Sequence, residues 1–290
     1  MRFSGHDTFH CKEQWLLKGL QLVNNQGDTS FLKNDEAIGI LGVGKNMVRS
    51  FHFWLKAFHL LDEQDNLTDY ANLVFLTEKH DPYLEKESSL WLLQYLLCSK
   101  NYATIYPLIF SDYFQDKVSF EFSEFQIVSF ISRILNDKKI KKFTPNTLKS
   151  DYNVFLKTYV LPQKNIKTIE DDYSTPLISL KLISRTNRKN HLNQNIYRLE
   201  KKINISLSEQ LFGFCLLDLF KDENAINFEQ IQQTLGSFFC LSTEGLEEVV
   251  SRLCDSHKEF VYKNDAGVRQ IQIKNTSDDF KKELFQFIYK

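Results

Sequence analysis

The feature that most constrains the fold is a three-residue glycine turn, Gly42-Val43-Gly44, between two segments with helical periodicity. Before the turn, a short apolar stripe follows Asn34 and Asp35, either of which can cap a helix. After the turn, apolar residues recur every three or four positions over residues 45–58. A further helical stripe covers residues 12–24. This order predicts a helix-turn-helix.

The second helix of that unit begins with polar side chains that suit DNA. Arginine pairs with guanine, asparagine pairs with adenine, and lysine at a helix N-terminus binds phosphate. The alternative is a helix that only packs against its neighbours and carries solvated charges. The predicted DNA contacts of this helix are Lys45, Asn46, Arg49 and Ser50.

The remainder of the chain predicts more helices and a few short hairpins. Residues 60–76 read as a small wing hairpin, and helices are expected at 88–97, 123–135 and 147–160. The last 85 residues predict helices at 207–220, 227–235 and 242–256, followed by strands at 259–263 and 268–274, which is the order of a winged helix. We therefore expect a mainly α fold with small β-hairpins and tandem helix-turn-helix or winged-helix-like domains, divided as 1–86, 87–204 and 205–290.

A second basic element lies between two strands expected within residues 177–203. The window 181–202 contains seven Lys or Arg residues against a single acid, Glu200. Such a hairpin can follow a phosphate backbone or enter a minor groove, although a run of charges is more often a solvated surface. The predicted DNA contacts here are Arg185, Arg188, Lys189 and His191.

Charge and hydropathy narrow the function classes. Lys+Arg 36 against Asp+Glu 37 gives a net charge of −1, so any surface for nucleic acid must be a local patch. No apolar run approaches the roughly 18 residues that cross a bilayer, and the five cysteines are scattered as reduced core thiols would be. We expect a cytoplasmic protein without membrane contact.

The catalytic candidates are few. Asp81 and Glu85 are a pair of acids that can share a magnesium or manganese ion for DNA cleavage, but the same residues also fit a helix start with Asp81 as its cap. Residues 39–46 match the spacing of a phosphate-binding loop, except that Asn46 replaces the required hydroxyl. His6, His10 and Cys11 offer metal-ligand types without a recognised spacing. No organic cofactor is expected.

Three blocks of the sequence resemble a bacterial domain family of formerly unknown function. They are Phe3–Phe9 with Trp15–Lys18, Leu41–Val48 with Trp54, and Asp81–Glu85 with Leu90–Leu93. Members of that family are similar to the DNA-nicking component of Ssp-type DNA phosphorothioation systems, which act against phage. The resemblance covers nearly the whole chain and implies partners of the cysteine desulfurase, ATPase and PAPS-reductase-like classes.

Two functions follow from these expectations. The first is a metal-dependent nicking endonuclease that opens one strand of double-stranded DNA for sulfur incorporation. The alternative is a non-catalytic DNA-binding adaptor or regulator that recruits the sulfur-transfer complex. The sequence leaves open both the choice between them and the formation of a homodimer.

Overall fold

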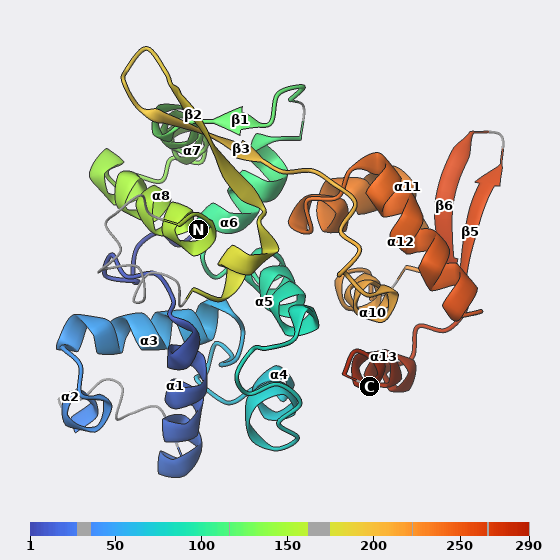
Figure 1. Cartoon of the computed structure of the whole chain (residues 1–290), viewed down its shortest axis with the longest axis horizontal. Coiled ribbons are helices and arrows are strands. Elements are labelled where there is room, and N and C mark those ends of the chain that lie inside the picture. Colours follow the sequence, from blue (N-terminus) through green and yellow to red (C-terminus); the bar gives the residue numbers. More distant parts are fainter. Residues whose placement is uncertain (28–35, 116, 162–174, 222, 266, 290) are drawn as a thin grey trace. The chain divides into compact units, whose positions relative to one another are not determined.

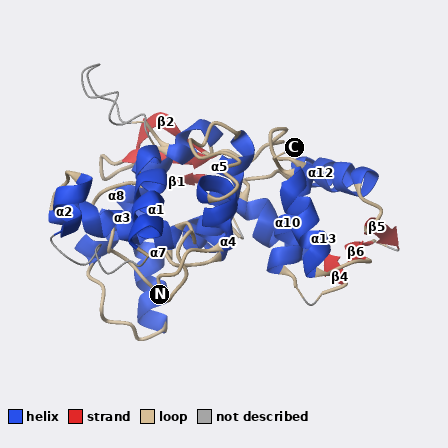
Figure 2. Ribbon diagram, turned by 90° about the horizontal axis from the view of Figure 1, so that it is seen from below, coloured by secondary structure: helices blue, strands red, loops and turns tan. Residues whose placement is uncertain are grey.

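The computed structural model describes residues 1–290 except 28–35, 116, 162–174, 222, 266 and 290. The chain forms two compact units, Met1–Glu200 and Lys201–Lys290. Both are mainly helical and each carries one small antiparallel sheet (Figures 1 and 2), so the coarse fold class is confirmed. The division of the first unit at residue 86 stays a prediction, and the cap candidates Asn34 and Asp35 lie outside the described residues.

The first unit is built from helices that follow the predicted stripes closely, with short helical turns between them. They are α1 (Glu13–Gln26), α2 (Glu36–Leu41), α3 (Lys45–Ala57), α4 (Asp69–Ala71), the π-helical η2 (Asn72–Leu76), α5 (Glu87–Ser99), α6 (Ile105–Pro107), the π-helical η3 (Leu108–Tyr113), α7 (Glu124–Asp137), α8 (Pro145–Tyr159) and the 3-10 turn η5 (Pro176–Leu180).

The glycine turn between α2 and α3 forms because Gly42 adopts a left-handed backbone, with φ 66°. Gly44 then takes the N-cap position of α3. The apolar stripe of α3 packs on α1, where the ring of Phe51 stacks on Trp15 at 4.5 Å between centroids. Gly19 of α1 lets the two helices approach, since a Cβ there would lie 3.1 Å from Leu55.

An aromatic core joins α3 to α6, η3 and α8. The Trp54 ring lies 6.3 Å from Tyr106, which in turn lies 5.5 Å from Phe155 of α8. Phe155 contacts Tyr159 at 5.3 Å. The Trp54 indole N–H donates to the carbonyl of Phe9 at 3.1 Å, so this buried polar group is satisfied. The core therefore fixes α3 and α8 within one rigid framework.

The sheet of the first unit has the strand order β1-β3-β2, with β1 (Glu121–Phe122), β2 (Ile183–Lys189) and β3 (Asn195–Leu199) all antiparallel. The register pairs Ile183 with Leu199 and Phe122 with Tyr197. The β2–β3 hairpin is the basic hairpin predicted from the sequence.

The second unit contains α10 (Glu209–Leu219), β4 (Ala225–Asn227), α11 (Phe228–Ile231), the π-helical η6 (Gln232–Gly236), α12 (Thr243–Ser256), β5 (Phe260–Asp265), β6 (Val268–Ile273) and α13 (Asp278–Phe287). The strand order is β4-β6-β5. The side chains of Ser208, Asn227 and Ser242 cap α10, α11 and α12.

The wing hairpin expected over residues 60–76 does not form over that length. Leu61 and Leu67 make one isolated bridge, which is flanked by main-chain hydrogen bonds from Asp62 to Asn66 and from Thr68 to Leu60, and Thr68 then caps the helical turns α4 and η2. In the part of the chain that the structure describes, no helix is both long and apolar enough to cross a bilayer.

Candidate nucleic-acid interface

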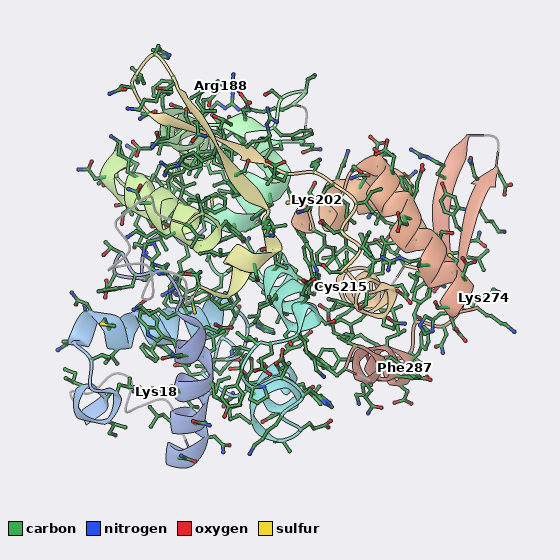
Figure 3. The ribbon with its side chains drawn as sticks, viewed as in Figure 1. Lys18, Arg188, Lys202, Cys215, Lys274 and Phe287 are labelled. Atoms are coloured by element: carbon green, nitrogen blue, oxygen red, sulfur yellow. The ribbon has the colours of Figure 1, made fainter. Side chains whose placement is uncertain are left out.

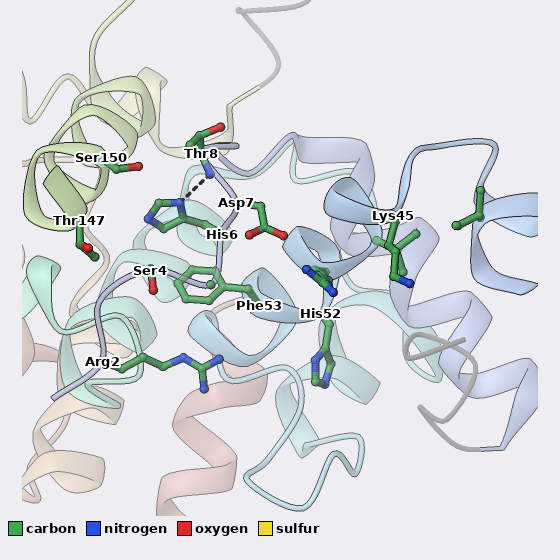
Figure 4. Close-up of a pocket in the computed structure, with 14 residues that line it drawn as sticks. Arg2, Ser4, His6, Asp7, Thr8, Lys45, His52, Phe53, Thr147 and Ser150 are labelled. Carbon is green, nitrogen blue, oxygen red and sulfur yellow. Dashed lines mark hydrogen bonds between the residues drawn. The ribbon is translucent and has the colours of Figure 1, made fainter. Parts of the chain in front are cut away.

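The polar start of α3 faces a hollow of about 810 Å³ in the first unit. Lys45, Arg49 and His52 line it at helical spacings of four and three residues, so all three lie on one face of α3. Arg2 and the segment from Ser4 to Thr8 line it as well, and so do Thr147 and Ser150 of α8 (Figure 4). Ile38 and Lys45, from the helices on either side of the glycine turn, thus meet the first block of the family resemblance at one site.

The N-terminal segment adopts an unusual backbone at this site. Ser4, Gly5, Asp7 and Thr8 all have positive φ, at 66°, 104°, 45° and 69°. A Cβ on Gly5 would lie 3.0 Å from the ring of Phe53, so glycine is needed both for the dihedral and for the close approach. Such conformations persist only where surrounding contacts impose them, and they cluster at ligand sites.

Those contacts come from a buried His–Asp pair. His6 Nε2 lies 3.0 Å from Asp151 Oδ1 of α8, and the main-chain N–H of Ser4 donates to the same oxygen at 2.8 Å. The N–H of Thr8 donates to His6 Nδ1 at 3.1 Å. Because Nδ1 accepts this bond, the imidazole proton resides on Nε2 and is donated to Asp151. His6 therefore anchors the strained segment to α8.

The hollow concentrates positive charge. The side chains of Lys45 and Arg49 are exposed at its edge. The Arg2 guanidinium stacks over the ring of Tyr102 at 4.1 Å from its centroid. Three basic side chains from two elements thus surround one concave surface, which is an arrangement suited to a phosphate-bearing ligand.

Two of the predicted DNA contacts of α3, Asn46 and Ser50, do not line the hollow. Asn46 is exposed but is not among the residues that line the hollow. Ser50 is 0 % exposed, so the prediction that it faces a DNA groove is wrong in this structure. Ser50 and Phe53 lie three residues apart on one side of α3, and the N-terminal segment covers Phe53 there. The helix is therefore packed on more sides than its apolar stripe indicates.

The basic hairpin is separate from the hollow, and part of its charge is neutralised. Arg188, on the outer part of β2 (Figure 3), pairs with Glu121 of β1, and so does Arg198 at 2.9 Å. The Arg198 and Arg188 guanidiniums together lower the pKa of the Glu121 carboxyl. Lys189 and His191 are exposed, while Arg185 is half-buried beside Tyr197. The hairpin thus presents less free charge than its composition indicates.

Asp81 and Glu85 form a turn rather than an open pair of carboxylates. Asp81 is 4 % exposed, and its two oxygens accept the main-chain N–H groups of Glu85 and Lys86 at 2.8 and 2.9 Å. The side chain of Glu85 is exposed. Among the described residues, no group of three or more His, Cys, Asp or Glu side chains is arranged to hold a metal ion. These hydrogen bonds close the turn before α5, which begins at Glu87 with Lys86 at its N-cap, so the helix start expected at Asp81 does not form.

Glu13, at the start of α1, lies within the electrostatic reach of this turn. Burial, and then the charges of Asp81 and Glu85, raise its pKa. The folded state therefore favours the protonated form of Glu13. This preference stabilises the fold at pH values below the ordinary pKa of glutamate, and the stabilisation is lost as pH rises through the raised pKa of Glu13.

We accordingly expect Glu13→Gln to melt at a higher temperature than the wild type at pH 8, with the difference vanishing near pH 4. Thermal unfolding at the two pH values measures this. Glu248→Gln, an exposed carboxyl on α12, is the matched control and should show no gain. An equal gain at both pH values would contradict the electrostatic cause.

The weaker sequence candidates have structural explanations. Residues 39–41 are helical within α2, whereas a phosphate-binding loop follows a buried strand, so the nucleotide-loop alternative at 39–46 is wrong. Cys11 is fully buried, which raises its thiol pKa, and His6 is bonded to Asp151. The third candidate ligand, His10, is half-buried.

The fold of this chain is similar to that of two solved SspB structures. A crystal structure of magnesium ion-bound SspB matches with a TM-score of 0.83 and 23 % identity, over 99 % of this chain and 87 % of that one. A further SspB crystal structure matches with a TM-score of 0.81 and 22 % identity over the same shares. No curated protein matches the chain. At these identities the likeness establishes a shared fold.

The family model of proteins of unknown function, DUF4007, matches residues 3–289. This match runs through the hollow, the hairpin and the second unit, and it confirms the family resemblance read from the three sequence blocks. The chain therefore belongs to the DUF4007 family.

Proposed function

We propose that this protein binds DNA through the hollow beside α3 and serves a phosphorothioation system of the Ssp type. The observation that carries the proposal is the convergence of Arg2, Lys45 and Arg49 on one concave surface. Phosphate contacts from such side chains supply most of the affinity for DNA. The fold shared with SspB supports the choice of system.

The helix-turn-helix interpretation supports the same surface. In this proposal α2, the glycine turn and α3 form the DNA-contacting unit, with α3 presenting its N-terminal half. Lys45, Asn46 and Arg49 are all exposed there. Enclosure of Asn46 and Arg49 in the interior would have excluded this docking mode, and neither residue is enclosed.

We also propose that the second unit is a winged helix whose third helix does not read DNA. Its order of one helix, a strand, two helices and two strands, with sheet order β4-β6-β5, supports the assignment. The exposed stripe of α12, however, consists of Glu244, Glu247, Glu248, Ser251 and Asp255. Carboxylates in a row repel a phosphate backbone. The DNA contact is therefore assigned to the first unit.

The direct test is titration of the purified chain into fluorescently labelled duplex DNA at 50 and 200 mM salt. Binding that weakens steeply with salt is expected, since each phosphate contact contributes about 0.9 to the slope of log affinity against log salt. Absence of binding at the lower salt would exclude the proposal.

Strand nicking is the enzymatic form of this proposal, and recruitment without cleavage is the alternative. A supercoiled plasmid assay with Mg²⁺, Mn²⁺ or EDTA separates them: metal-dependent open-circle product supports nicking, and no product with either metal supports the adaptor. Glu85→Gln is the informative variant, because Glu85 is exposed. Asp81 does not fit a metal-ligand role in this conformation, since both of its oxygens accept main-chain hydrogen bonds, and changing it would also disturb the turn.

A further inference from the structure

Asp7 is the acidic residue among the basic side chains of the hollow. Its Oδ2 atom is buried and has no hydrogen-bond partner among the described residues. Figure 4 shows the carboxylate directed from the N-terminal segment toward α3. Buried polar atoms are nearly always paired, so an unpaired oxygen on a residue that lines a cavity calls for a donor that the described residues do not supply.

The conformation of Asp7 indicates that this placement is imposed. Asp7 has φ 45° and lies between His6 and Thr8, whose hydrogen bonds with Asp151 and with each other hold the segment. The main chain thus keeps the carboxylate at the wall of the hollow instead of letting it turn into solvent. This arrangement costs strain that the fold tolerates.

The charges of the lining decide what kind of donor fits. Among the described residues that line the hollow, Arg2, Lys45 and Arg49 outnumber the one carboxylate, so the hollow favours a ligand with negative charge and disfavours a bare divalent cation. The ligand must carry hydrogen-bond donors for Asp7 as well. Ile38, Val48 and Phe53 add an apolar part to the lining that can contact a flat ring. A nucleotide combines these three properties.

A carboxylate accepts hydrogen bonds only, and this distinguishes the bases. Guanine presents two adjacent donors, N1–H and the N2 amino group, which match the two oxygens of a carboxylate. Thymine places its N3–H between two carbonyl oxygens that a carboxylate repels, and cytosine and adenine each offer one amino group. These guanine donors are free to meet Asp7 when the base is unpaired and turned out of the stack.

We propose that the hollow binds a single unpaired guanine nucleotide, with its phosphate on Lys45 and Arg49 and its Watson–Crick edge on Asp7. This deepens and rests on the proposed function where the guanine belongs to a DNA strand. A free guanine nucleotide has the same chemistry, so the test has an arm for each source.

The first arm measures binding of labelled single-stranded dT oligonucleotides with one central dG, dA, dC or no substitution. The wild type should favour the dG strand by about tenfold, the discrimination typical of a bidentate base contact. Asp7→Asn should lose this preference while keeping its affinity for the all-dT strand. Asp137→Asn, an exposed aspartate at the end of α7, is the control and should behave as the wild type.

The second arm measures binding of dGMP and TMP by calorimetry to the same three proteins. Binding of dGMP that Asp7→Asn abolishes supports the pocket with a free nucleotide as its source. Equal affinity for all strands in the wild type, or a dG preference that survives in Asp7→Asn, overturns the inference and leaves the proposed function standing. Asp7-dependent dGMP binding without any DNA binding would instead overturn the proposed function and keep the pocket.

Discussion

Replacing His6 with alanine should destabilise the first unit by about 3 kcal/mol, because a buried carboxylate that loses a hydrogen-bond donor and a main-chain N–H that loses its acceptor together cost that order of free energy. His6 is 5 % exposed and donates to Asp151, which is itself 4 % exposed. Its removal takes one of the two donors to the Asp151 carboxylate and the acceptor of the Thr8 N–H. The ring also packs edge-on against Phe53 at 5.5 Å between centroids.

The measurement is thermal or urea unfolding of His6→Ala beside Asp151→Asn and His80→Ala. Asp151→Asn keeps an acceptor oxygen for His6 and Ser4, so it should lose less stability than His6→Ala. His80 is half-buried and pairs with the surface residue Glu78, and its loss should cost less than about 1 kcal/mol. Equal stability of His6→Ala and the wild type would show that the segment is not held by this pair.

The prediction has a functional counterpart. The hydrogen bonds of His6 impose the positive φ values of the segment, so their loss should let the chain before α1 relax. Gly5 and Asp7 would then leave the wall of the hollow. His6→Ala should therefore also weaken DNA binding, although His6 itself is 5 % exposed.

Local patterns in the sequence were sufficient for α3 and its turn. Glycine at positions 42 and 44 and the apolar spacing after Lys45 are short-range signals, and both elements form where they were predicted. The helix over residues 72–76 was missed because apolar residues around a polar break fit a hairpin as well as a helix. Capping by Thr68 decides the outcome there.

The site depends on contacts that no local pattern contains. His6 and Asp151 are 145 residues apart in the chain, and only the packed core brings α8 to the N-terminal segment. From the sequence, His6 is recognised only as a residue type that can bind metal, and no local pattern assigns a role to Asp7 or Arg2. Ser50 was misjudged for a related reason: a helix wheel identifies one apolar face but not a second face covered by a distant segment.

In the proposed function, DNA contacts the first unit alone, through the polar face of α3 beside the Gly-Val-Gly turn and the anchored N-terminal segment. The double variant Lys45→Ala/Arg49→Ala should therefore weaken duplex binding by about tenfold to a hundredfold at low salt and reduce the salt slope by roughly two units. Both side chains are exposed, so stability should be retained.

The matched control is Lys263→Ala/Lys282→Ala, which removes two exposed lysines of the second unit and should change neither the DNA affinity nor the salt slope. An equal loss of DNA affinity in the two double variants would mean that the chain binds DNA through diffuse charge. A loss of affinity in Lys45→Ala/Arg49→Ala alone is expected if the DNA backbone docks at the hollow.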